Sequence, residues 1–179
     1  MKIIRIRDLT QVALLAALLA VSAWIAVPTE PPFTLQILAV FTAVGLFGTK
    51  KAFFAVLVYL ALGAVGLPVF SGFRGGVHHF VGSGGYLFGF LLAVLVAGAL
   101  LRLFGKGITA LLLAFFAGLA ACYLCSTVWY LLVLWPNTAD PLTFWMYLFY
   151  NVLVFLPADL VKIAVATLLT RKLSKGIKV

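Results

Sequence analysis

Six apolar stretches divide this chain of 179 residues. They cover residues 9–27, 33–48, 52–64, 86–103, 108–134 and 142–169. Although the third is short, they lie near the length of about 20 residues that a helix needs to cross the hydrocarbon layer of a membrane. The chain is 65% hydrophobic and only 9% charged, far from the balance of a soluble domain. The sequence therefore predicts an all-α integral membrane protein with six transmembrane helices in a single domain, residues 1–179.

The positive charges lie mainly between these stretches and indicate how they are oriented. Short cytoplasmic segments of membrane proteins are rich in Lys and Arg. With a cytoplasmic N-terminus, eleven of the 13 Lys and Arg residues fall in cytoplasmic segments: Lys2, Arg5, Arg7, Lys50, Lys51, Arg102, Lys106, Arg171, Lys172, Lys175 and Lys178. Both termini are therefore predicted to be cytoplasmic, with Glu30, Arg74 and Asp140 on the outer side. Membrane orientation explains the net charge of +9, and no basic patch interleaved with aromatic residues indicates nucleic-acid binding.

Asp159 and Lys162 lie inside the last apolar stretch, where a charged side chain costs about 2.5 to 3.5 kcal/mol on insertion scales. Their spacing of three residues places both on one face of a helix, so that they can pair. A ligand site is the favoured interpretation. A structural ion pair and a proton relay are the alternatives, although no further carboxylate in the spans favours a relay.

Residues 66–86 form the least regular part of the chain, a predicted loop of about twenty residues, which in a compact protein is more often functional than not. Its glycines suit tight turns and close approach of the backbone to a ligand. Arg74 in this loop either attracts an anion to the outer mouth of a site or contacts lipid headgroups. His78 and His79 are adjacent, and no third histidine or nearby carboxylate completes a metal site, so no bound metal is predicted.

Other polar and small residues within the apolar stretches need an explanation. Gln36 and Asn151 each require a hydrogen-bond partner, from a helix or from a ligand. Cys122 and Cys125 lie three residues apart in an apolar helix and are interpreted as small buried residues. Four alanines of the first stretch recur at spacings of three and four, a pattern that lets another helix approach closely or packs inside the bundle: Ala13, Ala16, Ala17 and Ala20.

Four motifs resemble the BioY family, the biotin-binding S components of energy-coupling factor (ECF) vitamin transporters. They are PFTLQ at residues 32–36, GAVGLPVF at 63–70, GGYLFGF at 84–90 and FLPADLVK at 155–162. Together they span nearly the whole chain in order. One departure is that the family has Gly-Pro-Thr-Gly-Gly-Tyr where this chain has Gly82-Ser83-Gly84-Gly85-Tyr86, and we expect the lost proline to loosen a turn there.

The resemblance implies a six-helix subunit of a bacterial cell membrane that binds biotin with high affinity from outside. It implies release of biotin inward after docking on a membrane coupling protein with two ABC-type ATPases. The chain has no phosphate-binding P-loop, so it is not expected to be an enzyme or to need a cofactor. An S component for another vitamin, an intramembrane enzyme and a structural or pore-forming membrane protein remain alternatives.

Biotin has a ureido ring with two N–H donors and one carbonyl, and a valerate tail. We expect Asp159 to accept from the ureido N–H groups and Lys162 to donate to the ureido oxygen or to Asp159. Additional contacts are assigned to Gln36, Asn151, Tyr86, Phe33 and, near the valerate, Arg74. The opposite orientation, with the valerate on Lys162, is the alternative. The alanines of the first stretch are the candidate coupling face.

Overall fold

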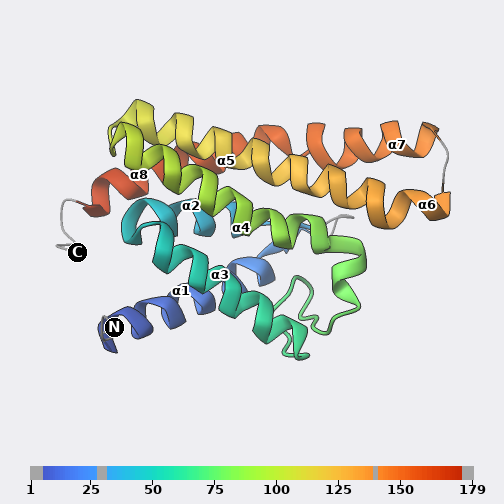
Figure 1. Cartoon of the computed structure of the whole chain (residues 1–179), viewed down its shortest axis with the longest axis horizontal. Coiled ribbons are helices and arrows are strands. Elements are labelled where there is room, and N and C mark those ends of the chain that lie inside the picture. Colours follow the sequence, from blue (N-terminus) through green and yellow to red (C-terminus); the bar gives the residue numbers. More distant parts are fainter. Residues whose placement is uncertain (1–5, 28–31, 139–140, 175–179) are drawn as a thin grey trace.

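The computed structural model describes residues 6–27, 32–138 and 141–174, most of them helical (Figure 1). Lys2, Arg5, Glu30, Asp140, Lys175 and Lys178 lie outside these ranges. The elements are α1 (Ile6–Trp24), β1 (Ala26–Val27), β2 (Phe33–Thr34), α2 (Gln36–Phe47), α3 (Thr49–Ala64), α4 (His79–Phe104), α5 (Ile108–Trp129), the π-helical turn η1 (Tyr130–Leu134), α6 (Trp135–Thr138), α7 (Pro141–Leu148), the π-helical turn η2 (Phe149–Leu153) and α8 (Leu156–Ser174).

Within the described residues, four helical segments are long and apolar enough to cross a membrane: Ile6–Trp24, His79–Phe104, Ile108–Leu134 and Thr143–Ser174. Large apolar side chains face outward on them, as on α5, where Leu113 and Leu124 are 61% and 64% exposed. This is the surface of a multi-pass membrane protein. The predicted second and third spans are short helices, because α2 has 12 residues and α3 has 16, which at about 1.5 Å per residue is less than the hydrocarbon thickness.

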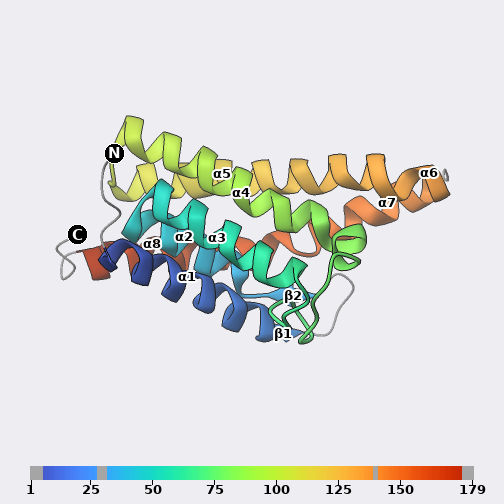
Figure 2. The ribbon, with the colours of Figure 1, turned by 60° about the horizontal axis from the view of Figure 1, so that its bottom comes forward.

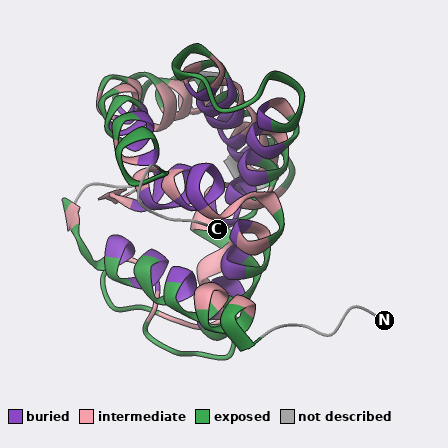
Figure 3. Ribbon diagram, turned by 90° about the vertical axis from the view of Figure 1, so that its left-hand side faces the viewer, coloured by how far each residue is buried: buried purple, intermediate pink, exposed green. Residues whose placement is uncertain are grey.

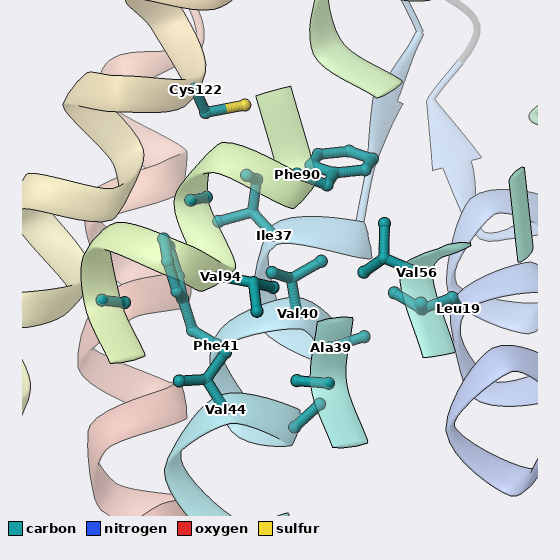
Figure 4. Packing of buried hydrophobic residues seen from close by; sticks show 14 of the residues in the cluster. Leu19, Ile37, Ala39, Val40, Phe41, Val44, Val56, Phe90, Val94 and Cys122 are labelled. Atoms are coloured by element: carbon teal, nitrogen blue, oxygen red, sulfur yellow. The ribbon is translucent and has the colours of Figure 1, made fainter. Parts of the chain in front are cut away.

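Helix α2 lies in the centre of the bundle. Nine of its 12 residues are buried, and it contacts α1, α3, α4, α5 and α8. Figure 4 shows Val40, Phe41 and Val44 of this helix packed among residues from the surrounding helices, and Phe41 stacks on Phe115 of α5 with ring centroids 4.9 Å apart. Gly48, with φ of +82°, ends α2 and leads directly into α3. Seen along the bundle, buried residues face inward and exposed residues outward (Figure 3).

The glycines at residues 82–85 lie inside α4 and do not form the predicted loop. Helix α4 begins at His79, seven residues before the predicted start of this span at Tyr86. Gly85 and Gly89 let α4 approach α5 closely, since a Cβ atom on Gly85 would lie 2.7 Å from Cα of Ser126 and one on Gly89 would lie 2.8 Å from Sγ of Cys122. Cys122 is buried as a small residue in this contact, as predicted, whereas Cys125, predicted to be buried as well, is only partly buried. The expected loosening of a turn by the missing proline is therefore wrong, because the segment is helical.

The loop between α3 and α4 is correspondingly shorter and is held by several contacts. Gly66, Gly72 and Gly76 have positive φ angles, which confirms the predicted use of glycine in its turns. Its residue Phe70 is buried and enters the space above Gly63, and the amide of Gly76 donates to the carbonyl of Gly63 over 2.7 Å. The loop therefore closes onto the end of α3.

The helix ends fall into two groups (Figures 1 and 2). The start of α1, the α2–α3 turn, the α4–α5 turn and the end of α8 lie at the left-hand end in both views. The short β1–β2 pairing, with Ala26 opposite Thr34, and the α3–α4 loop lie towards the other end, where α6 and α7 extend furthest. The sequence segments predicted to be cytoplasmic and described here thus gather at one end of the bundle.

Two glycines of α4 test the contact between α4 and α5. Gly85→Ala should destabilise the protein by about 1 to 3 kcal/mol, because its Cβ meets the backbone of α5. Gly82→Ala is the matched control, since its Cβ meets no atom within 4 Å and alanine favours a helix over glycine by about 1 kcal/mol. Thermal unfolding of the purified protein in detergent measures both. Equal midpoints for the two variants would contradict this account of the helix contact.

A buried acid and base beside a cavity

The last helical segment is broken in its middle, and the break places Asp159 near a helix N-terminus. Residues 154–155 form a turn between η2 and α8, and Pro157 lies in the first turn of α8, where its missing N–H costs nothing. The carboxylate of Asp159 lies in this first turn, where the helix dipole favours a negative charge. The predicted interruption at Pro157 is thus a helix start within an apolar segment.

Asp159 and Lys162 form an ion pair in the interior, with Nζ of Lys162 2.7 Å from Oδ1 of Asp159. The two residues are only 3% and 6% exposed. The hydroxyl of Tyr123 on α5 donates to the other carboxylate oxygen, Oδ2, over 2.7 Å. The ammonium also lies 3.8 Å from the ring centre of Phe33, a favourable cation–π contact. Both charges therefore have partners on three separate elements: β2, α5 and α8.

Gln36 is buried at the start of α2 and has partners on both sides of its amide. Its Nε2 donates to the hydroxyl of Tyr59 over 2.9 Å, and its Oε1 accepts from the hydroxyl of Thr34 over 3.0 Å. This arrangement fixes the orientation of the amide. It leaves one N–H of Gln36 and the hydrogen of the Tyr59 hydroxyl free to donate elsewhere.

A cavity brings these groups together and holds about 610 Å³ of empty space, counting the space at its open mouth. Eight of its fourteen lining residues are apolar or aromatic, and six are polar or charged. The lining residues are Pro32, Thr34, Gln36, Ile37, Tyr59, Phe70, Ser71, Ser83, Tyr86, Leu87, Phe90, Phe155, Asp159 and Lys162.

Four of the seven predicted binding residues, Asp159, Lys162, Gln36 and Tyr86, line this cavity. Phe33 does not line the cavity itself, but its ring contacts the ammonium of Lys162, which does. The other two predicted residues, Asn151 and Arg74, lie apart from its lining.

Asn151 turns its side-chain amide to the carbonyl of Tyr147, 3.0 Å away on its own helix, while its backbone carbonyl accepts from the hydroxyl of Tyr86. Arg74 is exposed on the α3–α4 loop. Ser71 of the same loop lines the cavity. Asn151 thus acts on the cavity through the position of Tyr86, and Arg74 lies outside its lining.

The predicted coupling face of α1 is divided by the structure. Ala16 and Ala20 are buried, together with Leu15 and Leu19, so they pack inside the bundle. Ala13 and Ala17 are exposed on the outer side of the helix. The exposed part of the predicted face is therefore a pair of alanines one turn apart.

Sequence reasoning missed several residues of the site. Tyr59 and Tyr123 hold Gln36 and Asp159, and Phe70 forms part of the wall. A buried tyrosine hydroxyl usually requires a partner, so the tyrosines inside apolar stretches were a usable signal. The spacing along the chain does not tell which helix faces which, and the partners are therefore visible only in the fold.

The fold is that of a multi-pass membrane protein, and the cavity between its helices is lined by a buried acid–base pair. The sequence model of the BioY family matches residues 1–179. The chain belongs to the BioY family.

Two relatives and one solved structure place the chain within this family. It is 36% identical over 169 residues to the probable biotin transporter BioY of Pyrococcus horikoshii, covering 93% of this chain and 96% of the relative. It is 48% identical over 96 residues to the biotin transporter BioY of Thermotoga maritima, covering 52% of this chain and 57% of that relative. A crystal structure of the S-component for biotin from an ECF-type ABC transporter matches with a TM-score of 0.78 and 28% identity, covering 95% of this chain and 92% of the other.

The ion pair gives a prediction for stability in the absence of ligand. Lys162→Met should cost about 3 to 5 kcal/mol, because it leaves the Asp159 carboxylate buried without a counter-ion. Adding Asp159→Asn should restore part of this loss, since the uncompensated charge is then removed. Tyr123→Phe should cost less, about 1 to 3 kcal/mol, because Lys162 stays in place. Thermal unfolding measures all three, and an unchanged midpoint for Lys162→Met would show that the pair is not charged in the free protein.

Proposed function

We propose that this chain is the biotin-binding membrane subunit, or S component, of an ECF-type vitamin transporter, and that it is not an enzyme. The observation that carries the proposal is a buried, electrically neutral acid–base pair on a small-molecule cavity, in a chain of the BioY family. The names of the relatives and the matched S-component for biotin support biotin as the ligand.

The polar groups of the cavity suit a ureido ring. Each carboxylate oxygen of Asp159 already accepts one hydrogen bond and retains a lone pair for a ureido N–H. The ammonium of Lys162 uses one N–H on Asp159 and contacts Phe33, which leaves a donor for the ureido oxygen. Such charge-assisted bonds are about twice as strong as neutral ones. Gln36 and Tyr59 add two further donors at the same wall of the cavity.

The neutrality of the pair favours the orientation with the ureido ring inside. An anionic valerate on Lys162 would lie close to the carboxylate of Asp159, which repels it. With the ring inside, the valerate extends towards the α3–α4 loop, where Ser71 lines the cavity and Arg74 lies exposed nearby in the chain. The aromatic rings of Tyr86 and Phe155 then pack beside the apolar part of the ligand.

We further propose six membrane crossings with both termini in the cytoplasm. The described cations outside the α3–α4 loop and the cavity belong to segments gathered at one end of the bundle: Arg7, Lys50, Lys51, Arg102, Lys106, Arg171 and Lys172. Such a concentration of Lys and Arg is typical of the cytoplasmic side. In this arrangement the cavity opens to the outside, and the short helices α2 and α3 cross with their neighbours covering their ends.

Energy for uptake is supplied, in this proposal, by a membrane coupling protein and two ABC-type ATPases on which the chain docks. The exposed alanines Ala13 and Ala17 are the proposed docking surface, because small side chains allow a partner helix to come close. Ala16 and Ala20 face the interior, so their part is to let α1 pack on the bundle.

Biotin titration of the purified protein tests the binding site. We expect Asp159→Asn and Lys162→Ala each to weaken biotin binding by at least about tenfold, the equivalent of about 1.4 kcal/mol, since each removes a buried charged hydrogen bond. Arg171→Gln on the exposed end of α8 is a control for charge alone. Unchanged affinity in both site variants would assign the pair to structure only, and competition by other vitamins would reveal a different ligand.

Biotin amide distinguishes the two orientations in the same titration. With the ureido ring on Asp159 and Lys162, loss of the valerate charge weakens binding only mildly. If amidation abolishes binding while Arg74→Ala leaves it intact, the valerate contacts Lys162 and the proposed orientation is reversed.

Tryptophan substitutions test the docking surface. Ala13→Trp or Ala17→Trp should abolish biotin uptake by cells and leave biotin binding by the purified subunit intact, because both side chains are exposed. Ala120→Trp, at an exposed alanine of α5, is the matched control and should leave uptake unchanged. Equal loss of uptake in the control would mean that a large exposed side chain anywhere on the bundle impairs transport, and would remove the support for this surface.

A further inference from the structure

A groove between the start of α3 and the end of α4 is separate from the cavity of Asp159 and Lys162. It is lined by Thr49, Lys50, Phe53, Phe54, Leu95, Ala99 and Arg102, and it contains about 630 Å³ of empty space, counting the space that is open to the outside. No residue lines both this groove and the cavity. The start of α3 and the end of α4, which supply its lining, lie at the end of the bundle where α1 begins and α8 ends (Figures 1 and 2).

Lys50 and Arg102 give the groove a positive charge that no carboxylate among the described residues neutralises. In the part of the chain that the structure describes, the acidic residues are Asp8 and Asp159. Asp8 pairs with Lys51 over 2.8 Å and Asp159 pairs with Lys162. Within this part no ion pair joins Lys50 or Arg102 to either carboxylate, so the two cations are available to an external anion.

The start of α3 is recessed relative to the end of α4. Thr49, the first residue of α3, packs against Gly98 of α4, where a Cβ atom would collide with the threonine side chain. Gly98 precedes the last residue of α4, Phe104, by six residues, or about 9 Å along the helix. The α2–α3 turn accordingly lies further in than the α4–α5 turn in both views. Lys50, the second residue of α3, therefore lies nearer the middle of the bundle than the end of α4 does.

The backbone at the start of α3 adds to this positive field. Gly48 precedes the helix, and no side chain caps its first amides. The unbonded N–H groups of a first helical turn carry partial positive charge and attract anions, above all phosphate. The first two residues of this turn, Thr49 and Lys50, line the groove together with Arg102.

The remaining walls of the groove are apolar and face the surroundings of the bundle. Phe54 and Leu95 are 53% and 47% exposed. An anion that fits this site therefore carries an apolar part next to its charge. Lipid with an anionic headgroup has this chemistry, and pockets with basic residues between membrane helices are suited to such headgroups.

We propose that this groove binds one anionic phospholipid. Lys50, Arg102 and the first amides of α3 contact its phosphate, and an acyl chain lies along Phe54 and Leu95. The lipid fills the step left by the recessed α2–α3 turn and so supplies the counter-ion that the described part of the chain lacks.

Native mass spectrometry of the full chain in detergent tests the proposal, with phosphatidylglycerol and phosphatidylcholine added in equal amounts. The wild-type protein should retain phosphatidylglycerol preferentially. The double variant Lys50→Gln/Arg102→Gln should retain roughly tenfold less phosphatidylglycerol than the wild type. The matched control is Arg171→Gln/Lys172→Gln, which removes the same charge from the same end of the bundle, on α8, and should keep the retention.

Three outcomes would overturn the proposal: equal retention of both lipids by the wild type, equal loss in the control variant, or no loss in the groove variant. Displacement of the lipid by inorganic phosphate or glycerol phosphate at equal concentration would assign the groove to a soluble phosphate compound instead. If lipid retention is unchanged and assembly with the coupling protein is lost, the groove is a protein contact. Biotin titration of the groove variant, which should be normal, separates this test from that of the proposed function.

Discussion

The buried pair of Asp159 and Lys162 is the constraint on which the arrangement of the helices depends. A single unpaired charge inside an apolar bundle is unfavourable. Breaking a buried ion pair by removing one partner costs about 3 to 5 kcal/mol of stability. Besides each other, the two charges have further stabilising partners. The first turn of α8 and the hydroxyl of Tyr123 stabilise the carboxylate of Asp159, and the ring of Phe33 stabilises the ammonium of Lys162. Because these partners come from α8, α5 and β2, the pair also ties together segments that are far apart in the sequence.

Close helix contacts and short helices create the space beside this pair. The glycines of α4 bring it against α5, and the short central helix α2 begins only at Gln36, after the paired strands β1 and β2. The end of the bundle near the strands is thus left with a cavity, whose wall includes Phe70 from the α3–α4 loop. Most residues of α2 are buried in the core, and its first residue, Gln36, lines the cavity. The same helix therefore contributes to both the core and the site.

The proposed functions are distributed over different faces of one small bundle. The cavity lies between helices, the exposed alanines of α1 face outward, and the cationic groove lies between α3 and α4. None of the lining residues of the cavity belongs to the other two surfaces. The proposed ligand binding, docking and lipid contact therefore use separate residues, so that each proposal can be tested separately.

The sequence by itself determined the helical membrane class, the family, and the acid–base pair, because apolar length and the cost of a buried charge are local properties of the chain. It also placed Gln36 and Tyr86 at the site, through motifs that resemble the BioY family. It misplaced the start of α4, since glycines that pack helices together look the same in sequence as glycines that form turns.

Only the tertiary structure decided which side chains meet. Ala16 faces inward and Ala17 outward although both fit the same small-residue pattern, Asn151 turns to its own helix, and Tyr123 donates to Asp159 across 36 residues of sequence. The reason is that helix periodicity fixes the faces of a helix, whereas the neighbour that each face meets depends on how all the helices pack together.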